Sequence, residues 1–283
     1  MLRKVCAIAL VATACVTGGV PSTPAAPGAP ATSFNLVTVE QDIEIGKQSA
    51  AEAEKKLTLL GEPAVDGYLN RIVTALVAGA PGAKYPYHAK AVRENEVNAF
   101  ALPGGPLYVN SGLLLAARNE AELAGVIGHE LSHIALRHGT HQASEAYAAQ
   151  TGLGVLGNLL GLGGTSDSAA VINAIGGLGL NAVFLKFSRD AESEADVTGA
   201  GMMARAGYDP NAMADFFEIL NQQAGRDPSS LEKFLSDHPA PADRETRIRT
   251  LAKTLPRGTP RNIGGFETMQ AAVRRVPSQA RSE

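Results

Sequence analysis

The feature that most constrains this chain is the pentapeptide His-Glu-Leu-Ser-His at residues 129–133. In a helix with 3.6 residues per turn, positions i and i+4 lie about 40° apart, so His129 and His133 share one face. Two imidazoles one turn apart can bind a single zinc ion, and Glu130 could then act as general base on a zinc-bound water. If it lies inside a helix, the pentapeptide therefore predicts a metallopeptidase site. The alternative is a helix whose histidines are merely exposed or satisfied in the core.

The sequence around the pentapeptide predicts such a helix. Asn119 is a favourable N-cap, and Glu122 three residues later completes a start that resembles a capping box. Apolar residues follow at mostly helical spacing, and the helix is expected to cover residues 120–138, where a glycine follows. His138 and His141 come at the end of this helix. We expect them to be surface residues that interact with the helix dipole rather than metal ligands.

A second stretch offers acidic candidates for a third ligand, which a catalytic zinc usually has. A helix is predicted from its cap at Ser188 to a stop at Gly207, and small residues in it would allow another helix to approach closely. Glu192 and Asp196 share a face, so Glu192 could bind the metal while Asp196 accepts the free N–H of a ligating histidine. The residues alone do not distinguish Glu192 from Glu194, and such acids could also form a solvated face.

Taken together, these motifs resemble the gluzincin metallopeptidases grouped with HtpX, the CAAX prenyl endopeptidase and the periplasmic proteases BepA and LoiP. That family combines HExxH with a later ExxxD, and the resemblance implies that Glu192 is the third metal ligand. Residues 98–105 are similar to the family's NAFALPGG segment, and His238 and Arg244 match its late HP…R motif. The similarity covers about residues 40–255.

Several roles within these motifs have more than one interpretation. By the resemblance, His238 could approach the zinc as a catalytic or regulatory group, or the His-Pro pair could simply shape a loop. Arg244 could pair with a site carboxylate, stabilise an oxyanion, or belong to a polar helix face. A predicted strand could bind an extended substrate by main-chain pairing, or it could be internal to the sheet. This strand segment contains Asn98, Ala99, Phe100 and Ala101.

The expected fold is α+β and mostly helical, a zincin-like metallopeptidase domain over residues 38–255 with a small sheet next to the motif helix. The other predicted elements are helices at residues 39–60 and 64–78 and strands at residues 87–92, 99–102 and 107–110. A hydrophobic content of 45% and a net charge of −3 suit one globular domain and give no indication of a nucleic-acid partner. Residues 152–187, rich in Gly, Leu and Ala, could form a helical lid or insert partly into a membrane surface. Residues 256–283 are expected to form a loose tail around one short helix.

Residues 1–14 have the pattern of a secretory signal, with two basic residues before a short apolar run. Small residues before Cys15 resemble a lipobox, which would make Cys15 the lipid-bearing end of a membrane-anchored protein. Cleavage at an ordinary Ala-x-Ala site is the alternative. Residues 15–37, rich in Pro and Ala, are expected to form a tether. By the resemblance we expect a periplasmic protein anchored to the outer membrane.

The expected function is that of a zinc-dependent endopeptidase with one Zn²⁺ per chain. By the resemblance, its substrates would be unfolded or misassembled envelope proteins, and the envelope assembly machinery is a candidate partner. The alternative is a latent or mainly chaperone-like assembly factor that retains the motifs without cutting. A purely structural lipoprotein would require the motifs to be coincidental.

Overall fold

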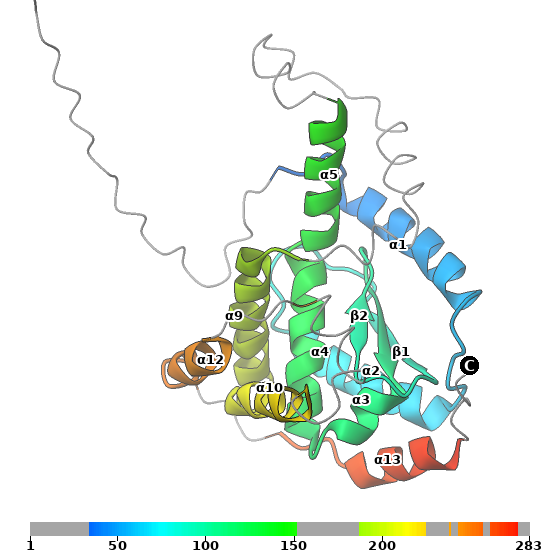
Figure 1. The fold of residues 1–283 in the computed structure, drawn as a ribbon, viewed down its shortest axis with the longest axis vertical. Coiled ribbons are helices and arrows are strands. Elements are labelled where there is room, and N and C mark those ends of the chain that lie inside the picture. Colours follow the sequence, from blue (N-terminus) through cyan, green and yellow to red (C-terminus); the bar gives the residue numbers. More distant parts are fainter. Residues whose placement is uncertain (1–33, 152–186, 225–237, 239–242, 257–260, 277–283) are drawn as a thin grey trace, which may run out of the picture.

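A computed structural model of the protein describes residues 34–151, 187–224, 238, 243–256 and 261–276. The motif helix α4 (Glu120–Ala135) lies at the centre of these segments, with α9 (Arg189–Ala206) beside it and a small sheet on its other flank (Figure 1). The expected mostly helical α+β fold, with a sheet next to the motif helix, is therefore confirmed.

Seven further helices surround this centre in the described part of the chain. They are α1 (Val39–Glu54), α2 (Pro63–Val77), α3 (Ser111–Ala116), α5 (His138–Thr151), α10 (Asn211–Ala224), α12 (Arg244–Ala252) and α13 (Phe266–Arg275). The sheet consists of β1 (His88–Val92), β2 (Ala99–Ala101) and β3 (Pro106–Asn110). The central strand β3 runs parallel to β1 and antiparallel to β2, so β2 is an edge strand of the described sheet.

The helices that carry the predicted site residues, α4 and α9, both begin at their predicted N-caps. The Glu122 N–H donates to Oδ1 of Asn119 at 2.9 Å and begins α4, as predicted. Oγ of Ser188 accepts from the Ala191 N–H at 3.1 Å, and Gly207 ends α9 in the left-handed region with φ 89°. Local sequence therefore fixes where each site helix starts and where α9 stops.

The end of α4 was predicted wrongly. The helix stops at Ala135 rather than at residue 138, because Arg137 takes a left-handed conformation with φ 60°. The guanidinium of Arg137 is held by the Asp42 carboxylate at 2.6 Å and by the carbonyl of Val37 at 2.6 Å. These tertiary partners stabilise a break that has no glycine, and α5 begins directly afterwards at His138.

The first helix also ends earlier than predicted. It stops at Glu54 rather than at residue 60, and Leu59 instead forms an antiparallel bridge with Val92 of β1. Beyond residue 255, α13 packs against α2 and α3 and buries Phe266 and Val273 in the main core. The packed body thus extends past the segment matched by the family motifs.

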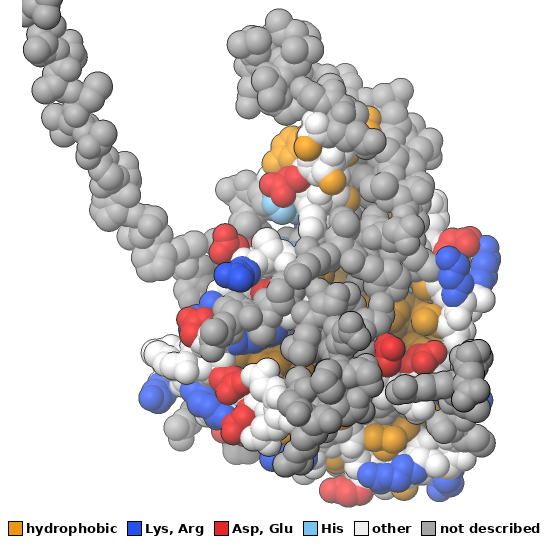
Figure 2. Space-filling model, in the orientation of Figure 1, with side chains coloured by type: hydrophobic (Ala, Val, Ile, Leu, Met, Phe, Trp, Pro, Cys, Tyr) orange, Lys and Arg blue, Asp and Glu red, His pale blue; other side chains and the backbone are white. Residues whose placement is uncertain are grey.

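The space-filling view shows basic and acidic side chains interspersed along the edge formed by α10 and α12 (Figure 2). Arg249 of α12 lies 2.8 Å from Asp215 and 3.2 Å from Glu218 of α10, so ion pairs link these two helices. No helix among the described residues combines the length and apolar character needed to cross a bilayer. The predicted signal with Cys15, nearly all of the predicted tether and residues 152–186 lie outside the described residues.

Candidate metal centre

Side chains from α4 and α9 converge at one point in the middle of the molecule. His129, His133, Glu192 and His238 each offer one ligand atom, and these atoms all lie within 4.8 Å of one another. Nε2 of His129 lies 3.1 Å from Nε2 of His133 and 3.3 Å from Oε2 of Glu192. All four residues are buried. The structure therefore brings together the three predicted metal ligands and adds a third imidazole.

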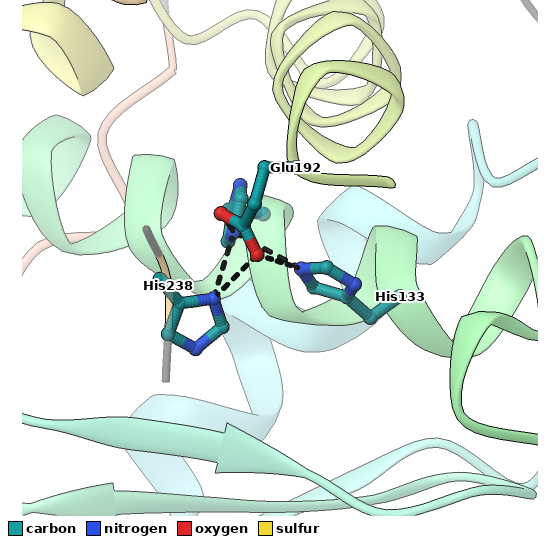
Figure 3. Close-up of side chains that lie close together, drawn as sticks. His133, Glu192 and His238 are labelled. Atoms are coloured by element: carbon teal, nitrogen blue, oxygen red, sulfur yellow. Dashed lines mark hydrogen bonds and ion pairs between the residues drawn. The ribbon is translucent and has the colours of Figure 1, made fainter. Parts of the chain in front are cut away.

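His238 lies inside this cluster, where Glu192 reaches from α9 between it and His133 (Figure 3). Nδ1 of His238 is 3.0 Å from Oε1 of Glu192 and 3.4 Å from Nε2 of His129. Its other ring nitrogen, Nε2, lies 3.3 Å from Oε1 of Glu130. His238 therefore contacts both the candidate ligands and the predicted general base, in addition to any role in shaping its loop.

The predicted general base, Glu130, is deeply buried. Its side chain is 1% exposed, and Oε1 makes no hydrogen bond within the described residues. Burial raises the pKa of this carboxyl group because the charged form loses its hydration. A buried carboxylate with a raised pKa is suited to accept and return a proton.

Asp196 and Arg244 form the outer layer behind His129. Oδ1 of Asp196 lies 3.0 Å from Nδ1 of His129, as predicted for a carboxylate that orients a ligating histidine. The Arg244 guanidinium donates to the same oxygen from Nη2 at 2.6 Å and from Nε at 3.0 Å. It also stacks over Phe217, with 3.7 Å between Cζ and the ring centroid. Arg244 thus pairs with a site carboxylate and is buried, so the interpretation as a solvated polar face is wrong for this residue.

The buried charges shift the acidity of the candidate ligands in different directions. Burial alone would raise the pKa of Glu192, but the neighbouring His129 and His133 hold it well below its usual range. Burial and Arg244 oppose protonation of His129, yet the Glu192 and Asp196 carboxylates raise its pKa to about 9. For His133, burial dominates and lowers the pKa well below the ordinary value.

The charge balance of the site fits a divalent cation. Glu130, Glu192 and Asp196 are three buried carboxylates, and Arg244 contributes one buried positive charge. Metal binding requires neutral imidazoles, and in that state these groups carry an excess of two negative charges, which one divalent ion would balance. Oε2 of Glu192 makes no hydrogen bond within the described residues, which leaves it available as a ligand atom. Imidazole nitrogen and carboxylate oxygen are donors that zinc prefers, so the residues present fit such an ion.

The chain matches the model of Peptidase family M48 over residues 63–254, which is more than half of its length. The chain belongs to peptidase family M48. It is 32% identical to the beta-barrel assembly-enhancing protease of Yersinia pestis over 77% of this chain and 45% of that protein. It is also 32% identical to the metalloprotease LoiP of Escherichia coli, over 72% of this chain and 78% of LoiP.

A more distant similarity is to the mitochondrial metalloendopeptidase OMA1 of Schizosaccharomyces pombe, at 31% identity over 67% of this chain and 52% of that protein. The chain spans about half the length of the beta-barrel assembly-enhancing proteases it matches. Membership of family M48 confirms the resemblance drawn from HExxH, ExxxD and the NAFALPGG segment, and it implies a metal-dependent peptidase site.

Sequence reasoning missed one residue of this M48 site. His138 is buried rather than at the surface, and its Nδ1 lies 2.9 Å from Nδ1 of His133. Its Nε2 lies 3.2 Å from Oε2 of Glu194, which is half exposed. On a continuous helix His138 would point about 140° away from His133, so only the break at Arg137 brings the two rings together. The sequence contains no glycine or proline at that break to reveal it.

The NAFALPGG segment of this M48 chain forms the edge of the sheet. The Asn110 N–H donates to the Asn98 carbonyl at 3.0 Å, and the Leu102 N–H donates to the Pro106 carbonyl at 2.8 Å. Because these bonds alternate along an antiparallel pair, the backbone groups of Ala99 and Ala101 point away from β3. The choice between an edge and an internal strand is therefore settled in favour of an edge within the described sheet.

Proposed function

We propose that the protein is a zinc-dependent endopeptidase in which His129, His133 and Glu192 bind the metal. The convergence of these three buried side chains from α4 and α9 is the observation that carries the proposal. Family membership supports a metal and a peptide substrate, and the His/His/Glu donor set favours zinc. When bound, zinc supplies Lewis-acid polarisation of the scissile carbonyl and lowers the pKa of a water molecule.

Glu130 is the proposed proton carrier of the reaction. It takes a proton from the attacking water and delivers it to the leaving amine, so that the peptide bond breaks without releasing a free amide anion. The burial that raises its pKa supports this role. Asp196 and Arg244 hold the ring of His129 in place during this cycle, through the bonds they share at Oδ1.

The edge strand β2 is the proposed docking line for the substrate backbone. The outward backbone groups of Ala99 and Ala101 could pair with an extended peptide regardless of its side chains. The strand packs against α4, which carries the motif, so a peptide paired there would run beside the proposed metal site. Such binding suits unfolded polypeptides, because a folded protein does not present a free extended segment.

The proposed cellular setting is the bacterial envelope. The name of the beta-barrel assembly-enhancing protease supports envelope proteins as substrates and the outer-membrane assembly machinery as a partner. The predicted signal and the lipobox before Cys15 support a periplasmic protein held at the outer membrane by a lipid anchor. Radiolabelled fatty acid should be incorporated into the parent chain and not into a Cys15→Ala variant.

A latent enzyme or an assembly factor that rarely cuts is the second candidate. It is favoured by the position of His238, whose Nδ1 lies 3.0 Å from Glu192 and within reach of the same ligand set. A fourth protein ligand would occupy the position that a catalytic zinc keeps open. His238→Ala would raise cleavage if His238 restrains the site, and would lower it if His238 assists the reaction.

The deciding experiment combines zinc quantification with cleavage of an unfolded protein by the full-length chain. Glu130→Gln should keep about one zinc per chain and lose cleavage by roughly 10²–10⁴-fold, the usual contribution of general acid–base catalysis. Glu267→Gln on α13, an exposed position remote from the site, is the matched control and should cleave like the parent. Undiminished cleavage by Glu130→Gln would contradict the proposed role, and the absence of zinc from the parent would contradict the metal site.

A further inference from the structure

The two ring nitrogens of His133 face different partners. Nε2 faces the proposed metal site, since it lies 3.1 Å from Nε2 of His129 and 3.4 Å from Oε1 of Glu192. Nδ1 faces away from that site and lies 2.9 Å from Nδ1 of His138. Two ring nitrogens at this separation share a single hydrogen bond, in which one donates and the other accepts.

Metal binding fixes the direction of that hydrogen bond. A ligating imidazole presents a lone pair at the nitrogen that faces the metal, so its hydrogen is on the other nitrogen. Nδ1 of His133 therefore donates, and Nδ1 of His138 accepts. A neutral His138 then has its hydrogen on Nε2, which lies 3.2 Å from the Glu194 carboxylate. A single arrangement of protons satisfies the whole chain from His133 through His138 to Glu194.

We propose that His138 is a positioning residue for the metal ligand His133, and that Glu194 fixes the tautomer of His138. This inference rests on the proposed metal site. The two histidines of the motif would then have different orienting partners. His133 would be oriented by the imidazole of His138, whereas His129 faces the Asp196 carboxylate directly. Such partners hold the ring plane and the tautomer of a ligand, and so they increase metal affinity.

The surrounding packing supports a positioning role. His138 is 5% exposed, and its ring centroid lies 5.0 Å from that of His133. Phe187 stacks on the His133 ring, with 4.0 Å between centroids and 16° between planes. His133 is thus held by an aromatic ring on its face and by a hydrogen-bond acceptor at its edge. The left-handed Arg137 delivers His138 to this place.

The test measures zinc affinity by competition with a chromophoric chelator in the full-length protein. His138→Leu, which fills space but cannot accept a hydrogen bond, should weaken zinc binding by about 10–100-fold. His138→Asn should stay within about threefold of the parent, because its Oδ1 stands close to the place of the imidazole Nδ1 and can accept from His133. A role in packing alone predicts the reverse order, with Leu tolerated better than Asn, and that order would overturn the proposal.

Glu194 has a matched control on the same helix. Glu194→Ala should weaken zinc binding measurably, whereas Asp190→Ala removes an exposed carboxylate one turn earlier and should leave the affinity unchanged. The cobalt-substituted protein gives a second measurement, because a displaced His133 would change the visible absorption bands in His138→Leu and not in Asp190→Ala. Parent-like affinity and spectra in His138→Leu would refute the positioning role.

The outcomes separate this inference from the proposed function. A parent chain that binds zinc tightly but does not cleave peptides would contradict the endopeptidase proposal, and the ranking of the His138 variants would still decide the inference. If the parent chain cleaves peptides and His138→Leu binds zinc as tightly as the parent, the inference is overturned and the proposed function stands. A parent chain that binds no zinc would overturn both.

Discussion

A methyl group added at Gly199 should disrupt the metal site more than the fold. Gly199 of α9 lies against the backbone of α4, and a Cβ there would stand 2.9 Å from the Gly128 carbonyl carbon and 3.0 Å from the His129 nitrogen. Both are backbone atoms, so no side chain can move aside. Since ordinary contact begins at 3.4 Å, the two helices would have to separate by about 0.5 Å.

The magnitudes follow from this separation. Overpacking of this kind costs about 1–3 kcal/mol, while replacing a helical glycine by alanine gains about 1 kcal/mol. The net loss in the free energy of unfolding for Gly199→Ala is then about 0–2 kcal/mol. Metal affinity should be affected more strongly than stability, because Glu192 lies on α9 while His129 and His133 lie on α4. Metal–ligand distances tolerate only about 0.2 Å, which is less than the expected separation.

The assay compares Gly199→Ala with Gly201→Ala on the same helix. A Cβ at Gly201 would meet only the flexible tip of Arg205, at 3.4 Å, so this variant should bind zinc like the parent and gain stability. The midpoint of thermal unfolding should fall by at most about 4–8 °C in Gly199→Ala, at about 2–4 °C for each kcal/mol in a chain of this size. Zinc affinity equal to that of the parent in Gly199→Ala would refute the argument that close helix contact sets the ligand geometry.

Two further predictions concern carboxylates outside the metal site, the buried Glu120 and the half-buried Glu54. Glu120 accepts hydrogen bonds from the Tyr68 and Tyr208 hydroxyls at 2.7 and 2.9 Å. Glu120→Leu should therefore cost about 1–3 kcal/mol for each donor left unpaired, and urea denaturation should show a smaller loss for Glu120→Gln, whose amide can still pair with both hydroxyls. Burial alone would raise the pKa of Glu54, but its bond to Lys90 holds the pKa below the ordinary value. Its contribution to stability is present above the ordinary pKa and is lost as the pH falls through the lowered one, so the stability difference between the parent and Glu54→Gln should shrink from pH 7 to pH 3. A difference that grows towards pH 3 would contradict this assignment.

The parts of the structure that follow local rules were predictable from the sequence. Asn119 and Ser188 begin the site helices because a short polar side chain can satisfy the free N–H groups of the first turn. Gly207 ends α9 because a left-handed residue is needed there and glycine adopts that conformation without strain. The spacing of HExxH placed both histidines on one face of α4 for the same kind of local reason.

The parts that depend on distant contacts were not predictable. Arg137 adopts a left-handed conformation that its own side chain disfavours, and the stabilising partners, Asp42 and Val37, lie near residue 40 in the sequence. The burial of His138 follows from that break, so its partnership with His133 could not be inferred from a helical pattern. No local pattern links α4 with α9, so their convergence does not follow from local rules. It was inferred instead from the family resemblance.

Among the residues that the structure describes, one helix carries the carboxylates that organise the histidines of the HExxH motif. Glu192 faces both rings, Asp196 bonds to His129, and Glu194 bonds to His138 behind His133. These three residues occupy alternate positions at the start of α9, so they cannot move independently of one another. Any displacement of α9 therefore alters a proposed ligand and both orienting contacts at once. The close contact at Gly199 matters for this reason, because a single helix–helix distance determines the geometry of the whole ligand set.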